Sequence, residues 1–260
     1  MTPDEFVQLT TEGYNRIPVV EEVLADLDTP LSTYLKLAAG PHSYLLESAQ
    51  GGEKWGRYSI IGLPARTVLK VVGTHITVTT DGKLVEQTDS DDPLDFIEKF
   101  LGRFRVAHAP GLPRFYGGLV GYFGYDTVRY VEKRLAHSTP PDSLGTPDIL
   151  LMVSNDVIVF DNLRGRMQII TLADPATPDA LIRAREYLQT IGRRLAGPVP
   201  DITASSANQP VDESDFVSEF GREAFLAAIE KIREYIVAGD VMQVVLAQRL
   251  SVPFTAAPIN

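Results

Sequence analysis

The sequence predicts a protein of the mixed α/β class, with helices and antiparallel strands in the α+β manner. Runs with apolar residues at every second position indicate successive strands between residues 43 and 86. The dipeptide Asp81-Gly82 separates two of these runs, which is typical of a tight turn between antiparallel strands. Apolar residues recur at helical spacing in 94–101 and 178–195, so helices accompany the strands.

The composition excludes several classes of protein. The chain has 260 residues, of which 44% are apolar and 22% charged, so it can bury a core and is not intrinsically disordered. It has no cysteine, which excludes a disulfide scaffold, a thiolate metal site and a cysteine nucleophile. With 24 basic and 34 acidic residues, its net charge is −10, and this argues against nucleic acid as a partner.

The amino terminus bears on the location of the protein. Met1 to Glu5 is acidic and lacks the basic and then apolar run of a secretory signal. No later apolar run approaches the length of a membrane span. We therefore expect a soluble, cytoplasmic protein with no membrane partner.

The first hundred residues predict a helix followed by strands. Residues 18–27 indicate an initial element or a short helix. Thr29 is a suitable cap and Pro30 a suitable first residue for a helix that extends to Leu37. Strands are predicted at 43–48, 58–61, 67–72, 75–80 and 83–86. A helix is expected to follow from Leu94 to Leu101.

The middle of the chain contains a glycine-rich segment at 117–124. Its spacing fits neither a dinucleotide fingerprint nor a phosphate-binding loop, so we predict that its glycines allow close packing of the backbone. Further strands are predicted at 148–153, 156–161 and 166–172, followed by the helix at 178–195. Between residues 197 and 218 large apolar residues are few, which indicates a linker.

The last forty residues predict a helix at 222–236, which ends near Gly239, and a strand at 241–252. Both faces of that strand are apolar, so it needs neighbours on both sides. The sequence supplies none after it. We therefore expect these residues to be the front part of a longer polypeptide.

Two places carry residues with alternative interpretations. On the strand at 43–48, Glu47 and Ser48 could hold the charged groups of a free amino acid, or they could form an ordinary strand end. Gln243 is an amide in an apolar strand, and it either ties neighbouring strands together or forms the wall of an active site. The four histidines are scattered without the short spacing of a zinc site.

Four ordered blocks give the chain a family resemblance. They are Leu45–Ser48, Gly56–Gly62, Tyr116–Asp126 and Gly239–Arg249. With these blocks the chain resembles the amino-terminal portion of the chorismate-utilising enzymes, and within them the anthranilate synthase component I group most. The resemblance implies two antiparallel sheets packed on each other with surrounding helices, of which this chain would hold an incomplete part.

The resemblance also implies a reaction and its regulation. The reaction is the Mg²⁺-dependent conversion of chorismate and ammonia to anthranilate and pyruvate in tryptophan biosynthesis. A glutamine amidotransferase subunit would supply the ammonia, which makes the protein a hetero-oligomer. Tryptophan would inhibit by binding at the amino-terminal region, with Ser48 as the position carried over as a contact and Glu47 and Tyr58 as further candidates nearby.

Gln243 separates branches of the family. Relatives that add water to chorismate place a lysine base at this strand position, whereas those that add ammonia carry glutamine. The resemblance places the metal ligands and the other catalytic groups beyond residue 260, so we expect no metal site in this chain and no activity from it alone. It further implies a regulatory, partner-facing domain at 1–197, a linker at 198–218 and the start of the chorismate-binding domain at 219–260.

Two alternatives remain open at this point. The large subunit of aminodeoxychorismate synthase shares the ammonia-adding chemistry, and the segment that best separates it from anthranilate synthase is absent here. A protein of another class, a non-catalytic tryptophan-binding module, would sense the amino acid without acting on chorismate.

Overall fold

The computed structural model describes residues 1–47, 56–136, 138–139, 141–200, 211–254 and 259. The chain divides into two compact units, Met1–Pro200 and Asp201–Asn260, and each is described by itself. Residues 201–210 of the expected linker lie outside the described residues. The roles assigned above to 1–197, 198–218 and 219–260 stay predictions.

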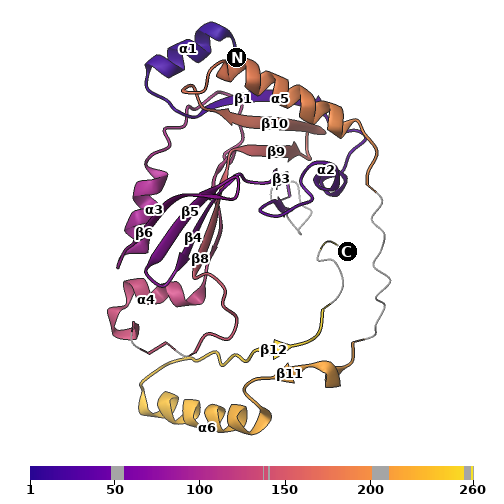
Figure 1. Ribbon diagram of the computed structural model, residues 1–260. Helices are drawn as coiled ribbons and strands as arrows, with labels where there is room; N and C mark the ends of the chain where they lie inside the picture. Colours follow the sequence, from indigo (N-terminus) through magenta and orange to yellow (C-terminus); the bar gives the residue numbers. More distant parts are fainter. Residues whose placement is uncertain (48–55, 137, 140, 201–210, 255–258, 260) are drawn as a thin grey trace. The chain divides into compact units, whose positions relative to one another are not determined.

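A five-stranded antiparallel sheet forms one half of the first unit (Figure 1). Its strand order is β1-β10-β9-β3-β2. The strands are β1 (Ile17–Leu24), β2 (Tyr44–Leu46), β3 (Tyr58–Gly62), β9 (Asp156–Asp161) and β10 (Arg166–Ala173). Each neighbouring pair is antiparallel, so strands from the beginning and the end of the unit share one sheet.

A second five-stranded antiparallel sheet has the order β6-β5-β4-β8-β7. Its strands are β4 (Thr67–Val72), β5 (His75–Thr80), β6 (Lys83–Asp89), β7 (Gly118–Phe123) and β8 (Ile149–Ser154). Only Asn155 separates β8 from β9, so the chain passes directly from one sheet into the other. The two antiparallel sheets with helices confirm the predicted α+β class.

Helices cover one face of the first sheet. They are α1 (Pro3–Thr11), α2 (Pro30–Leu37) and α5 (Ala180–Leu195). Thr29 caps α2 through a capping box and Pro30 is its first residue, as predicted. The core beneath these helices contains fully buried side chains of the sheet and buried residues of α5, among them Ile17, Ile61, Ile158, Met167, Ile169, Leu188 and Ile191.

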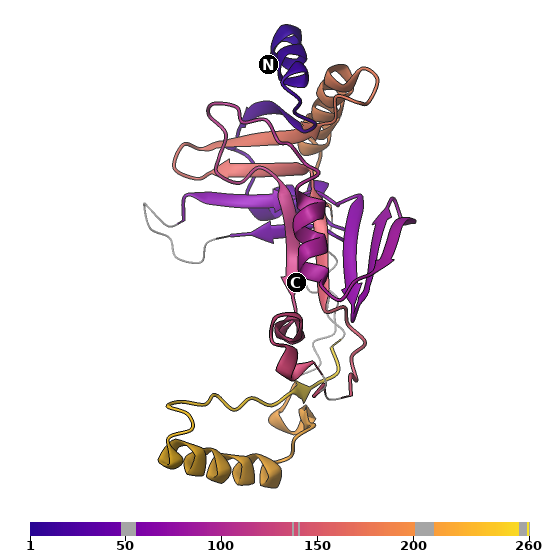
Figure 2. The same ribbon diagram turned by 90° about the vertical axis from the view of Figure 1, so that its left-hand side faces the viewer.

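The second sheet has its own core against α3 (Pro93–Leu101), which stands beside it in Figure 2. Asp92 caps α3, and Ile97 and Phe100 pack on the buried residues Leu69, Val71 and Ile149. At the turn between β5 and β6, Asp81 and Gly82 have φ values of 51° and 73°. Two positive φ angles are what a type I′ hairpin requires, and this confirms the predicted turn.

The short segment after β7 contains α4 (Val128–Val131) between single turns of 3₁₀ helix. Within the described ranges, no helix combines the length and the apolarity needed to cross a membrane.

Of the two alternatives for residues 18–27, an initial element or a short helix, the short helix is wrong. Residues 17–24 form β1, which pairs along its whole length with β10, from Ile17 opposite Ala173 to Leu24 opposite Arg166. A partner about 150 residues away in the sequence supplies hydrogen bonds that local propensity cannot indicate.

The glycine-rich segment forms β7 and confirms the prediction of close packing. A Cβ atom added to Gly121 would lie 1.9 Å from the backbone oxygen of Leu150 in β8. One added to Gly117 would lie 2.7 Å from the backbone oxygen of Ser154. The glycines therefore allow β7 to lie against β8 more closely than a side chain would permit.

The second unit contains α6 (Arg222–Ala238) and two short paired strands, β11 (Val217–Ser218) and β12 (Leu250–Ser251). Gly239 ends α6 with a φ of 81°, as predicted. The predicted strand at 241–252 is wrong over most of its length, because residues 241–249 are irregular. A strand forms only where a neighbouring strand pairs with its backbone hydrogen-bonding groups. Here β11 pairs with only two residues, Leu250 and Ser251.

Candidate functional site

Two of the three predicted regulatory residues, Glu47 and Tyr58, lie at one end of the first sheet. Ser48 lies outside the described residues. Glu47 is exposed and directly follows β2, and Tyr58 is the first residue of β3 with 39% of its surface exposed. Because β2 and β3 pair with Leu46 opposite Ile60, Glu47 and Tyr58 lie at the same end of neighbouring strands. The structure thus brings both residues to the same end of the sheet, with Tyr58 on the face that carries Leu46 and Ile60.

Gln243 belongs to the second unit and is exposed within the irregular segment 241–249. The predicted strand that would carry Gln243 is therefore not formed there. Arg249 instead makes an ion pair with Glu219, with 2.6 Å between its Nη2 and the carboxylate Oε2. The assignment of Gln243 to an active-site wall stays a prediction.

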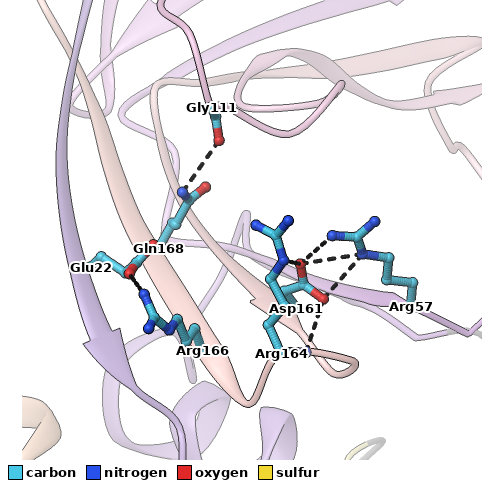
Figure 3. Close-up of polar contacts among 7 residues, drawn as sticks. All are labelled: Glu22, Arg57, Gly111, Asp161, Arg164, Arg166 and Gln168. Carbon is cyan, nitrogen blue, oxygen red and sulfur yellow. Dashed lines mark hydrogen bonds and ion pairs between the residues drawn. The ribbon is translucent and has the colours of Figure 1, made fainter.

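An ion pair that sequence analysis missed adjoins Tyr58. Nε and Nη2 of Arg57 donate hydrogen bonds to both carboxylate oxygens of Asp161, at 2.6 to 3.2 Å. The Arg57 guanidinium also lies over the Tyr58 ring, 4.8 Å from its centroid. Figure 3 shows the hydrogen bonds between Arg57 and Asp161. Together with the contact to the Tyr58 ring they orient this guanidinium.

Asp161 comes from β9, and the pairing of β3 with β9 places it directly opposite Tyr58. No local pattern marks it, because it lies 104 residues from Arg57 in the sequence. Arg57 itself stands in the block Gly56–Gly62 that carries the family resemblance, and this was the available signal.

Arg57 and Asp161 line a small pocket of about 60 Å³. Arg164 lies 3.8 Å from the Asp161 carboxylate on the side opposite Arg57, and Arg166 is ion-paired with Glu22 of β1 (Figure 3). The rest of the wall is formed by Tyr58, Gly111, Leu112, Pro113, Val159 and Gln168. Three guanidinium groups and two carboxylates therefore line one recess of the sheet.

A larger cavity of about 500 Å³ adjoins the small pocket, because Gly111, Leu112 and Gln168 line both. Gln168 donates a hydrogen bond to the Gly111 oxygen at 3.4 Å, at the point where the two meet. Apolar side chains such as Leu9, Pro18 and Val20 line one part of the larger cavity, and polar side chains, including Glu5 and Glu12 of α1, line the rest.

Arg57 holds the pKa of Asp161 below its ordinary value of 3.8, chiefly through its hydrogen bonds to the carboxylate. A lowered folded-state pKa stabilises the fold above pH 3.8, and this contribution is lost as the pH falls through the folded pKa. We expect Asp161→Asn to reduce the free energy of unfolding at pH 7. The difference in this free energy between the wild type and the variant is expected to shrink as the pH falls below 3.8. Urea unfolding of both proteins across this range measures the difference, and a difference independent of pH would contradict the expectation.

The described residues do not form a site for the implied Mg²⁺. Among them, no group of three or more His, Cys, Asp or Glu side chains is placed to hold a metal ion. The carboxylates of the arginine-lined recess are engaged with arginines, which leaves them unsuited to a divalent cation. We therefore derive no chemical step through magnesium from these residues.

Comparison with known families identifies the same family as the four sequence blocks. Residues 43–260 match the family of chorismate binding enzymes, so the match includes β2, β3 and the whole second unit. The chain belongs to this family. The resemblance seen in the sequence is thereby confirmed.

Two curated relatives match the chain over its full length. The protein named anthranilate synthase component 1 from Pseudomonas putida is 56% identical over 100% of this chain and 53% of its own length. The protein of the same name from Neisseria meningitidis serogroup B is 50% identical, over 100% of this chain and 52% of its own length. The chain thus spans about half the length of the curated relatives it matches.

A solved structure gives the same result for the fold. Anthranilate synthase component I from Streptococcus pneumoniae TIGR4 superposes with a TM-score of 0.62 at 27% sequence identity. The match covers 92% of this chain and 50% of that chain. The fold is therefore that of a chorismate binding enzyme, of which this chain represents one part.

Proposed function

We propose that this chain belongs to the large subunit of anthranilate synthase, which converts chorismate and ammonia to anthranilate and pyruvate in tryptophan biosynthesis. The observation that carries the proposal is the 50 to 56% identity, over the whole chain, to proteins named anthranilate synthase component 1. The matched region spans the whole chain and therefore includes both units.

The proposal includes a partner and a metal. A glutamine amidotransferase subunit supplies the ammonia, which makes the active protein a hetero-oligomer; the name component 1 of the relatives supports the existence of a second component. Magnesium supplies positive charge for the carboxylates of chorismate when it is bound. Its ligands lie in the part of the protein outside these residues, and this chain by itself is inactive.

Gln243 bears on which nucleophile attacks. A neutral amide can orient chorismate or ammonia by hydrogen bonding, but it cannot take a proton from water as an unprotonated lysine can. Its presence supports addition of ammonia and argues against formation of isochorismate.

Tryptophan inhibits the protein by binding near Glu47, Ser48 and Tyr58. The carboxylate of Glu47 can pair with the ammonium group of a free amino acid, and the Tyr58 ring offers an aromatic contact. The position of Glu47 and Tyr58 at the same end of β2 and β3 supports this assignment.

The test is an assay of the protein at its natural length with chorismate, ammonium ions and Mg²⁺. We expect anthranilate, detected by its fluorescence, and inhibition of its formation by tryptophan. The 260-residue chain assayed alone under the same conditions is expected to form none. Formation of 4-amino-4-deoxychorismate without tryptophan inhibition would overturn the proposal in favour of an aminodeoxychorismate synthase, and tryptophan binding without any turnover would favour a sensor module.

A further inference from the structure

The recess around Arg57 and Asp161 contains more arginines than carboxylates. Arg57 occupies both oxygens of Asp161, and Arg166 is paired with Glu22. The remaining cation, Arg164, lies 3.8 Å from the Asp161 carboxylate, beyond hydrogen-bond distance, and its side chain is 71% exposed. Three arginines against two carboxylates leave the recess with a net charge of +1.

The sheet register places these groups side by side. Arg166 lies opposite Asp161, and Asp161 lies opposite Tyr58, so the three side chains form one row across β10, β9 and β3. Gln168 and Val159 form the next row. Arg164 stands in the turn between β9 and β10, so its guanidinium reaches the same row from the end of the hairpin (Figure 3).

The size of the recess restricts what can enter it. A volume of about 60 Å³ accommodates a carboxylate or another small anionic group but not a whole ligand. The adjoining cavity of about 500 Å³ has the size of a small-molecule site. Its wall includes the apolar residues Leu9, Pro18, Val20 and Leu112 and the carboxylates of Glu5 and Glu12, so the acid group of a ligand is favoured at the arginine end and its apolar body in the larger cavity. The two spaces meet where the walls share Gly111, Leu112 and Gln168.

We propose that the two spaces together bind a small organic acid, with its carboxylate at Arg164 and Arg166 and its apolar body against Leu112 and Val20. The planar guanidinium fork matches a carboxylate, and Arg164, which shares Asp161 with Arg57 and is 71% exposed, provides the attraction. Arg166 exchanges Glu22 for the ligand at little cost, because their ion pair is about half exposed. The cavity next to the recess removes the apolar body from water.

The proposal is tested with benzoate as the probe, titrated into the protein at its natural length by calorimetry. Benzamide has the same shape without the charge, and acetate has the charge without the ring. We expect benzamide and acetate each to bind at least about tenfold more weakly than benzoate. Equal binding of benzamide would overturn the role of the arginines, and equal binding of acetate or inorganic phosphate would overturn the role of the cavity.

The matched variants are Arg164→Gln with Arg166→Gln, and Arg66→Gln as the control. Arg57 is left in place because its removal would strip Asp161 of its partner. Arg66 is likewise an exposed arginine, paired with Asp81 in the second sheet. We expect the double variant to lose benzoate affinity by at least about tenfold and the control to keep it. Unchanged affinity in a folded double variant would overturn the proposal.

This inference goes beyond the proposed function, but both use Tyr58, which lines the recess. Tryptophan inhibition of the same variants is therefore measured in parallel. Retained tryptophan inhibition with lost benzoate binding supports an acid site separate from the feedback site. Loss of both together would make the recess part of the tryptophan site and overturn its independence, whereas benzoate binding in a protein insensitive to tryptophan would refute the feedback assignment alone.

Discussion

Replacement of Gly121 with alanine is expected to destabilise the first unit by about 3 kcal/mol or more. The added Cβ would lie 1.9 Å from the backbone oxygen of Leu150 and 2.9 Å from its carbonyl carbon. These are backbone atoms of the neighbouring strand, so no side-chain rotation can relieve the overlap. β7 and β8 would have to separate, although they pair over six residues from Gly118 to Phe123.

Urea unfolding measures this loss, and Gly192→Ala is the matched control. Gly192 lies within α5, and a Cβ atom there would meet nothing within 4 Å. Alanine has a higher helix propensity than glycine. The free energy of unfolding of the control is therefore expected to stay the same or to rise by about 0.5 to 1 kcal/mol. A Gly121→Ala protein as stable as the wild type would show that β7 does not need the close approach.

Replacement of Gln243 with lysine, in the protein at its natural length, is expected to lower anthranilate formation by about a hundredfold. Under the proposed function, this side chain faces the reacting part of chorismate. A lysine in a site closed to water has a lowered pKa, so its neutral amine can take a proton from water. Water then competes with ammonia, and isochorismate is expected among the products. Chromatography of the products from chorismate, ammonium ions and Mg²⁺ measures both.

Gln243→Met separates the loss of the amide from the gain of a base. Methionine has nearly the length of glutamine and cannot accept a proton. We expect it to lower anthranilate formation without isochorismate. An unchanged rate of anthranilate formation in the lysine variant would remove Gln243 from the active site.

The elements that depend on neighbouring residues were predictable. The helix α2 begins at Pro30 because Thr29 caps it, and the hairpin turns at Asp81-Gly82 because both residues accept positive φ. α6 ends at Gly239 for the same local reason. In each case the deciding contact lies within a few residues of the signal.

The arrangement at the candidate site was predictable only in part. The block around Glu47 and the block around Tyr58 were recognised separately, and the pairing of β2 with β3 brings them to one end of the sheet. Asp161 carried no local signal, yet it engages Arg57 and stands opposite Tyr58. Strand order decides such neighbours, and it depends on the packing of all five strands.

The residues alone therefore established α2 from Pro30 to Leu37, the presence of α3, α5 and α6 to within two residues at each end, and the family that the chain resembles, since caps, turns and motif blocks are local. Only the tertiary structure decided that residues 17–24 form β1 beside β10, and that the segment 241–249 has no strand partner among the described residues. A strand exists through hydrogen bonds to a distant partner, and no pattern within the strand specifies which partner is present.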